Sequence, residues 1–255
     1  MGEPRRIRLL GSRISTHQKR HELAAFLRRA RTGSFGGYGW RLNAGLPEYD
    51  RELHYPVKDL VREFFRSGRP VEVLDGGCGT AQAAAELKQH FGDRVNVSGI
   101  GLVRLPSREE LEKNRHKWRF SSGRLVFGED KDYFQARSLV EQFHANRKLL
   151  ANYWAGLMET HAFGGKRFDV IISTLALKHS RYVLYSVENL LNHLSPGGAA
   201  LLNLEKIAHG SRPAFTRTVR GMRRAGCKVS DLGGHRVLVR RPITLTSPIA
   251  LLESP

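Results

Sequence analysis

The segment VEVLDGGCGTA, residues 71–81, constrains the fold of this chain more than any other part of it. The apolar run at 71–74 reads as a short strand, GGCGT as a tight turn, and residues 81–91 as a helix. Glycines in such a turn let the backbone approach a ligand without a Cβ clash, and the following helix N-terminus supplies free N–H groups. Open α/β sheets bind ligands at the carboxyl ends of their strands. The segment therefore predicts a ligand site beside Asp75.

Strand and helix patterns alternate through the rest of the chain. Further strands are expected at 95–100, 125–127, 168–173, 199–204, 227–231 and 235–240, with helices near 107–118, 182–194 and 213–225. This alternation predicts an α/β fold with a doubly wound, mostly parallel sheet.

One connection is longer than a crossover requires. About forty residues separate the expected third and fourth strands, where about a dozen would suffice. Apolar residues recur at helical spacing over 133–162. We expect a helical insertion between strands 3 and 4, which either shapes substrate choice or adds core packing.

Three parts are expected along the chain. Residues 1–54 would be a helical N-terminal extension, made of a basic arm, a helix from Thr16 to about Arg31 and a glycine-rich stretch at 32–40 that is either a lid or a linker. Residues 55–241 would form the Rossmann-like domain, and 242–255 a tail.

The net charge of +18 is concentrated in two segments. Residues 1–34 hold nine basic and two acidic residues, and residues 212–241 hold nine basic and one acidic. Arg217, Arg220 and Arg224 share one helical face in the second segment. Basic segments attract polyanions through counterion release, so RNA is an expected partner, and a solvated basic face is the alternative.

Other features bear on the compartment. The sequence contains no apolar run of about 18 residues, which predicts no membrane span. Two cysteines cannot form a disulfide framework and fit no metal pattern, so no metal is expected. A cytoplasmic or other intracellular location fits best, with organellar targeting left open by the Arg-rich N-terminus.

The glycine turn does not suit a dinucleotide. The G-x-G-x-x-G fingerprint would need a glycine where Gln82 stands, and Asp75 would place a negative charge near a pyrophosphate. A ligand with a cationic end suits Asp75 better.

Three segments carry a family resemblance. DGGCGTA (75–81) is similar to motif I of the class I methyltransferases, FDVIISTLALKH (168–179) resembles their fourth-strand segment, and LSPGGAALLN (194–203) resembles the turn and strand that follow. The resemblance covers roughly residues 55–241 and implies the class I fold, S-adenosylmethionine as cofactor and methyl transfer as the activity.

The resemblance also implies roles for single residues. Asp75 would orient the methionine amino group, directly or through water. The turn would lie against the cofactor, Glu129 or Asp130 after the third strand would lie near the adenine, and Ser173 and Thr174 would lie beneath the methyl donor and acceptor. The turn residues concerned are Gly76, Gly77, Gly79 and Ala81.

One position departs from the family. An acid commonly ends the second strand and binds both ribose hydroxyls, whereas this chain has Gly101 there. Loss of such a contact costs roughly 1–3 kcal/mol in binding. The departure also admits a non-catalytic, methyltransferase-like protein that acts in RNA binding or assembly.

The acceptor is less well defined. His179 lies just beyond the fourth strand and is the candidate base if the acceptor must lose a proton, with a surface histidine as the alternative. The charge distribution favours RNA or a ribonucleoprotein as acceptor, and a small metabolite is the alternative. The oligomeric state is not indicated.

Overall fold

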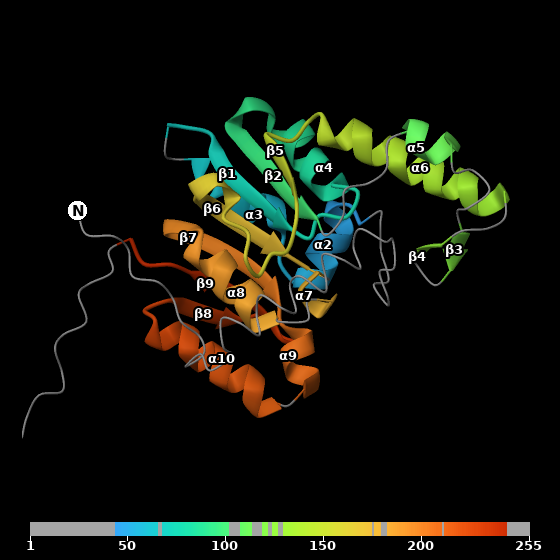
Figure 1. Ribbon diagram of the computed structural model, residues 1–255. Helices are drawn as coiled ribbons and strands as arrows, with labels where there is room; N and C mark the ends of the chain where they lie inside the picture. The colour runs from blue at the N-terminus through green and yellow to red at the C-terminus, as the bar shows by residue number, and fades with distance from the viewer. Residues whose placement is uncertain are drawn as a thin grey trace, which may run out of the picture.

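Seven strands form one sheet in the order β5-β2-β1-β6-β7-β9-β8 in the computed structural model (Figure 1). Neighbouring strands from β5 to β7 pair in parallel, and β9 is antiparallel to both β7 and β8. The mostly parallel, doubly wound sheet expected from the sequence is confirmed. The strands are β1 (Val71–Gly76), β2 (Val95–Gly101), β5 (Asn152–Ala155), β6 (Phe168–Ser173), β7 (Leu194–Asn203), β8 (Lys228–Asp231) and β9 (Arg236–Arg240).

The structure describes residues 44–65, 68–101, 108–113, 119–121, 124–126, 130–174, 176–179, 183–210 and 212–243. The basic arm, the helix expected at 16–31, the glycine-rich stretch at 32–40 and the end of the tail lie outside the described residues.

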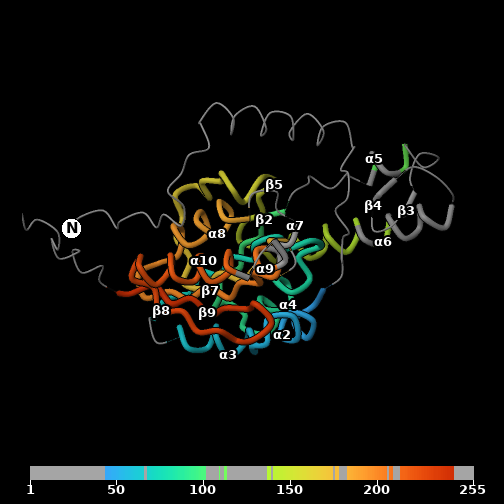
Figure 2. The backbone as a smooth tube through the Cα atoms, turned by 90° about the horizontal axis from the view of Figure 1, so that it is seen from below, coloured from blue at the N-terminus to red at the C-terminus, as the bar shows by residue number. Residues whose placement is uncertain are grey.

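Helices cover both faces of the sheet. Figure 2 shows α2 and α3 on one side of it and α8 on the other. The helices are α2 (Leu46–Leu53), α3 (Val57–Arg62), α4 (Gln82–Phe91), α5 (Arg108–Lys113), α6 (Asp130–Arg147), α7 (Ala176–His179), α8 (Val183–Asn192), α9 (Glu205–Gly210) and α10 (Arg212–Arg224), with the 3-10 turns η2 (Gly92–Arg94) and η4 (Phe163–Gly165).

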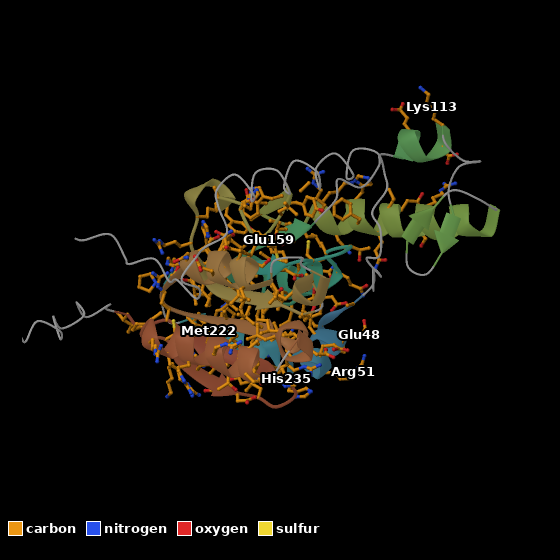
Figure 3. The ribbon with its side chains drawn as sticks, turned by 60° about the horizontal axis from the view of Figure 1, so that its bottom comes forward. Glu48, Arg51, Lys113, Glu159, Met222 and His235 are labelled. Carbon is orange, nitrogen blue, oxygen red and sulfur yellow. The ribbon has the colours of Figure 1, made fainter. Side chains whose placement is uncertain are left out.

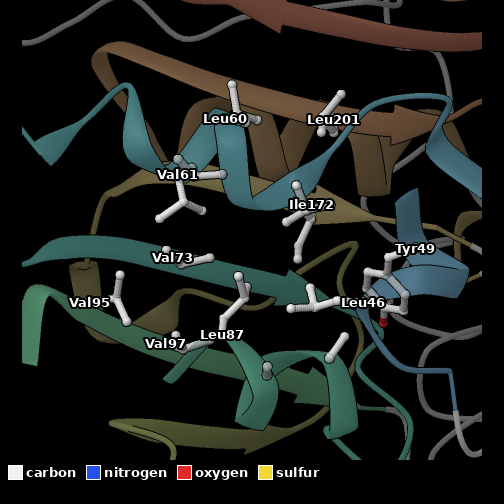
Figure 4. Close-up of a cluster of buried hydrophobic side chains, with 14 of the residues drawn as sticks. Leu46, Tyr49, Leu60, Val61, Val73, Leu87, Val95, Val97, Ile172 and Leu201 are labelled. Carbon is white, nitrogen blue, oxygen red and sulfur yellow. The ribbon is translucent and has the colours of Figure 1, made fainter. Parts of the chain in front are cut away.

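The strand residues divide between two apolar cores because successive side chains point to opposite faces. On β6, Val170 and Ile172 join the core beneath α2, α3 and α4, which Figure 4 shows in close-up. Ile171 joins the other core, with side chains of α7, α8, α9 and α10. All three are completely buried, as expected of a continuous apolar strand covered on both faces.

The third strand of the sheet is not the one expected. Residues 124–126 form β4 (Arg124–Val126), which pairs only with β3 (Arg119–Ser121) in a separate two-stranded sheet among the described residues. The position beside β2 is taken by β5, whose segment ANYWAG was assigned to the expected helical insertion. The helix α6 therefore precedes the third strand of the sheet instead of following it.

The folded domain also begins earlier than residue 55. Leu46, Tyr49 and Leu53 of α2 are buried in the core with α3 and α4. Their spacing of three and four residues places them on one helix face. The outer face is polar, and Figure 3 shows Glu48 and Arg51 pointing away from the domain.

None of the described helices combines the length and the apolar character that a membrane span requires.

Candidate functional site

The turn after β1 is fixed to the neighbouring strand. The N–H groups of Gly77 and Cys78 both donate to the carbonyl of Ile100 in β2, at 2.8 and 3.1 Å. Gly77 and Gly79 have φ angles of +91° and +53°. These angles lie in the left-handed region that glycine adopts without strain, which explains the glycines at both positions.

The helix that follows the turn starts without a side-chain cap. Its N-cap residue is Ala81, which is buried and has a left-handed φ of 58°. No side chain caps the N–H groups of the first turn of α4. A non-glycine residue in this region carries strain of about 1 kcal/mol, and such strain concentrates at functional sites. An uncapped N-terminus leaves N–H donors for a ligand.

The acid at the end of β1 is fully buried and bound by α2. The hydroxyl of Tyr49 lies 3.1 Å from each carboxylate oxygen of Asp75, and Figure 4 shows Tyr49 reaching from α2 toward this region. Burial raises the pKa of Asp75 to about 7, and the hydrogen bond from Tyr49 opposes that rise. Burial, together with the charge of Asp75, also raises the pKa of Tyr49, so the phenol remains the donor.

Ser173 and Thr174 support this arrangement from β6. Ser173 is buried, and its hydroxyl donates to the carbonyl of Gly76 at 2.7 Å. Thr174 is also buried, and its side chain lowers the pKa of Tyr49, in opposition to the effect of burial. The Ser173 hydroxyl therefore binds the main chain of the turn, and Thr174 lies beside the Tyr49–Asp75 pair.

Gly76 and Gly77 are packed against protein atoms. A β-carbon at Gly77 would lie 1.8 Å from the β-carbon of Ala176 in α7, so the approach of this helix requires glycine there. A β-carbon at Gly76 would lie 3.3 Å from the sulfur of Met158. The family resemblance implied that both glycines would lie against the cofactor.

Gly101 ends β2 as expected, and a tyrosine occupies the space beside it. A β-carbon at this position would lie 2.5 Å from the hydroxyl oxygen of Tyr153 in β5. Sequence reasoning missed Tyr153 because its segment was assigned to a helix.

The expected adenine residues do not follow the third strand of the sheet. Asp130 is the first residue of α6, and Glu129 lies outside the described residues. Gly156, Leu157 and Met158 stand after β5 instead. The assignment of Glu129 and Asp130 to the adenine depended on residues 125–127 being the third strand of the sheet, and that strand assignment is wrong.

Two other groups of predicted residues lie on helices after β6 and β7. His179 is the last residue of α7, which follows the carboxyl end of β6. Its catalytic role stays a prediction. Arg217, Arg220 and Arg224 lie on α10, and all three are exposed.

Asp169 lies at the other end of β6, one residue after the strand begins. Its carboxylate binds the Arg69 guanidinium through two contacts, at 2.7 and 2.8 Å. It also accepts a hydrogen bond from the N–H of Glu72 at 3.0 Å. Asp169 therefore binds Arg69 and the main chain of β1 at the amino-terminal ends of the strands.

These residues fit a cationic nucleoside ligand such as S-adenosylmethionine. Asp75 supplies a carboxylate whose ionised form a nearby cation would favour, and α4 supplies uncapped N–H groups. Tyr153 supplies a hydroxyl at the end of β2. No group of three or more potential metal ligands is assembled among the described residues.

Residues 49–224 match the family model described as a methyltransferase domain. No curated protein matches the chain.

Several solved structures are similar in fold. The cyclase SpnF has 14% identity and a TM-score of 0.44, with 89% of this chain and 95% of that chain covered. Magnesium protoporphyrin IX methyltransferase from Synechocystis, solved with bound SAH, has 12% identity and a TM-score of 0.40, covering 89% and 99%. Precorrin-6Y C5,15-methyltransferase from Geobacter metallireducens has 12% identity and a TM-score of 0.39, covering 72% and 85%.

The family match covers more than half of the chain and includes α2 from Tyr49 onward, the motif I turn, β6 and β7. The chain therefore belongs to the methyltransferase domain family and is an S-adenosylmethionine-dependent methyltransferase.

Proposed function

We propose that this methyltransferase acts on RNA or on an RNA–protein complex. The observation that carries the proposal is the outer face of α10, where Arg217, Arg220 and Arg224 are exposed. None of the three forms an ion pair with a residue in the part of the chain that the structure describes.

The opposite face of α10 explains why these arginines point outward. Thr218 and Met222 are buried, and Val219 packs against the apolar core. The three arginines span about 10 Å of helix at a rise of 1.5 Å per residue. Such a row of cations can contact successive phosphates without reading the sequence of the RNA.

The location of α10 relates this surface to the site. The helix α9 directly follows the carboxyl end of β7, and α10 follows α9 and packs against it. The first turn of α10 therefore lies close to the end of the sheet where β1 and β6 also end, and the basic row follows along the helix. Residues 1–34 carry a second cluster of basic residues, which we propose adds to the same attraction.

The cofactor supplies a methyl group on an activated sulfonium. The residues of this chain contribute mainly by positioning and by excluding water. Asp75 would hold the cationic methionine end, and the turn and α4 would provide N–H donors. If the acceptor must lose a proton, we propose that His179 receives it, and we expect His179→Gln to reduce kcat about 100-fold or more.

Cofactor binding is tested first by calorimetry. We expect Asp75→Ala to abolish binding of S-adenosylmethionine, while circular dichroism shows that the fold survives. Unchanged affinity would place the cofactor elsewhere on the molecule.

The RNA proposal is tested by neutralising the row on α10. The triple variant Arg217→Gln, Arg220→Gln, Arg224→Gln would be compared with the wild type for binding a labelled hairpin RNA across a salt series. Removal of three phosphate contacts should reduce the slope of log K against log salt by roughly 2–3. The control variant is Arg51→Gln, Lys58→Gln, Arg62→Gln on α2 and α3, which removes the same charge and should leave the slope near the wild-type value.

The acceptor class is tested by tritium transfer. Labelled cofactor is incubated with the protein and a cell extract, and the label is followed into RNA and low-mass fractions. We expect label in RNA. Label only in low-mass compounds would overturn the proposal in favour of a small-molecule methyltransferase, as would an α10 variant that binds RNA like the wild type.

A further inference from the structure

The end of β2 lacks the acid expected there, and a hydroxyl from the neighbouring strand fills the space. Gly101 is buried, and a β-carbon built on it would lie 2.5 Å from the Tyr153 hydroxyl oxygen and 3.3 Å from the ring carbon that bears it. Tyr153 pairs with Gly99, two residues earlier on β2. Its ring therefore extends along the strand to the carboxyl edge, where the hydroxyl stands in place of a side chain at residue 101.

The tyrosine ring is held from the side by α6. Phe143 packs edge-on against it, with ring centroids 4.9 Å apart, and is almost completely buried. The guanidinium of Arg147 lies 5.6 Å from the ring centroid. Phe143 and Arg147 are four residues apart and so share a helix face. The helix thus restricts the ring to a narrow range of positions.

The chemistry of the hydroxyl matches that of a ribose diol. Burial raises the pKa of Tyr153 far above its ordinary value, an effect that nearby Cys78 increases and Arg147 opposes. The hydroxyl therefore keeps its proton and can donate one hydrogen bond and accept another. A ribose hydroxyl has the same capacity, so a phenol can bind one where a carboxylate would accept from two.

We propose that Tyr153 replaces the missing acid as the side chain that binds the cofactor ribose, with α6 holding it in position. The inference rests on the binding of S-adenosylmethionine to this domain. It assigns the segment 130–147 a role in completing the cofactor site from outside the sheet.

The first test measures affinity by calorimetry with S-adenosylhomocysteine. Tyr153→Phe keeps the ring and removes the hydroxyl, and we expect it to weaken binding about tenfold. The matched control is Tyr55→Phe, whose hydroxyl binds Glu63 on the exposed surface and which should bind like the wild type. Thermal unfolding of the free proteins checks that both variants are folded.

Cofactor analogues that lack one ribose hydroxyl distinguish the loss of a ribose contact from a general disturbance of the binding site. The wild type should bind the 2′-deoxy or the 3′-deoxy form of S-adenosylhomocysteine about tenfold more weakly, and Tyr153→Phe should weaken that analogue no further. An equal loss for ribose and both deoxyribose forms would overturn the proposal, as would unchanged affinity of Tyr153→Phe.

A rescue provides an independent test. Tyr153→Ala clears the space, and adding Gly101→Asp then places a carboxylate at the end of β2. We expect the double variant to bind at least tenfold more tightly than Tyr153→Ala alone. No gain would show that this position does not face the ribose. Failure of the wild type to bind the cofactor at all would instead overturn the cofactor assignment.

Discussion

The hydroxyl of Tyr49 lies equidistant from the two carboxylate oxygens of Asp75, at 3.1 Å from each. Both residues are buried, and within the described residues no cationic side chain forms an ion pair with Asp75. The relationship joins α2, which precedes the first strand, to the acid of the glycine turn. A change in the charge of Asp75 should therefore also affect the packing of α2.

The free energy of unfolding should depend on pH because of this buried acid. The pKa of Asp75 is about 7 in the folded protein and 3.8 in its ordinary state, so the folded protein binds the proton more tightly. Its contribution to stability is present below about pH 4 and is lost as the pH rises to about 7 and beyond. The full loss is on the order of 4 kcal/mol.

The comparison that isolates this effect is Asp75→Asn. Urea unfolding of cofactor-free protein at several pH values from 5 to 8 gives the free energy of unfolding for each. We expect the variant to gain stability relative to the wild type as the pH rises, because the amide has no proton to lose. A constant difference across this range would contradict the raised pKa.

Removing the Tyr49 hydroxyl should shift the loss of stability with rising pH to higher pH. The hydrogen bond from Tyr49 lowers the pKa of Asp75, so Tyr49→Phe should raise it further. The variant should also lose about 1 kcal/mol of stability at neutral pH through the missing hydrogen bond. Urea unfolding of Tyr49→Phe with and without Asp75→Asn forms a double-mutant cycle. Additive effects of the two changes would show that the contact is energetically unimportant.

The fold could be predicted from the sequence wherever strands are long and apolar. VEVLD and FDVIIS are buried on both faces, and their runs of Val, Leu and Ile are typical of central parallel strands. The edge strand β5 could not be recognised in the same way. Its sequence, NYWA, is short and only partly buried, and adjacent apolar residues match helical spacing equally well.

Of the candidate site, the sequence could place the residues at the strand ends but not the side chains that reach them from other elements. The glycine turn, Asp75 and Gly101 are all local to strand ends, so the sequence could place them. Tyr49 and Tyr153 reach the same edge from α2 and β5, at 26 and 52 residues from Asp75 and Gly101 respectively. Local patterns do not encode such pairings. The stripe Leu46, Tyr49, Leu53 was visible in the sequence, but it does not show which side chain binds an acid.

The close packing of α7 on the glycine turn makes Gly77 sensitive to substitution. Gly77→Ala introduces a β-carbon 1.8 Å from that of Ala176 and forces alanine to a φ of +91°. We expect a loss of about 3 kcal/mol or more in the free energy of unfolding, measured with urea.

A second substitution separates the two causes. In Gly77→Ala, Ala176→Gly, the nearest remaining atom of residue 176 is its Cα at 3.3 Å, so the steric part should be largely relieved. The backbone strain of about 1 kcal/mol should remain, together with about 1 kcal/mol for glycine in α7. If the double variant is no more stable than Gly77→Ala, the contact with α7 is not the source of the loss.

The carboxylate at the amino edge should matter for stability and not for the cofactor. Asp169 binds the Arg69 guanidinium and the Glu72 N–H with a side chain that is only 8% exposed. Asp169→Ala removes these contacts and leaves a main-chain donor unpaired, so we expect a loss of about 2 kcal/mol in urea unfolding. Asp93→Ala is the control, because Asp93 is fully exposed and its pair with Lys88 should contribute little to stability. Calorimetry should give the same affinity for S-adenosylmethionine in both variants, since the turn and Asp75 lie at the opposite ends of the strands. A large loss of affinity in folded Asp169→Ala would mean that the amino and carboxyl ends of the strands are coupled through β6.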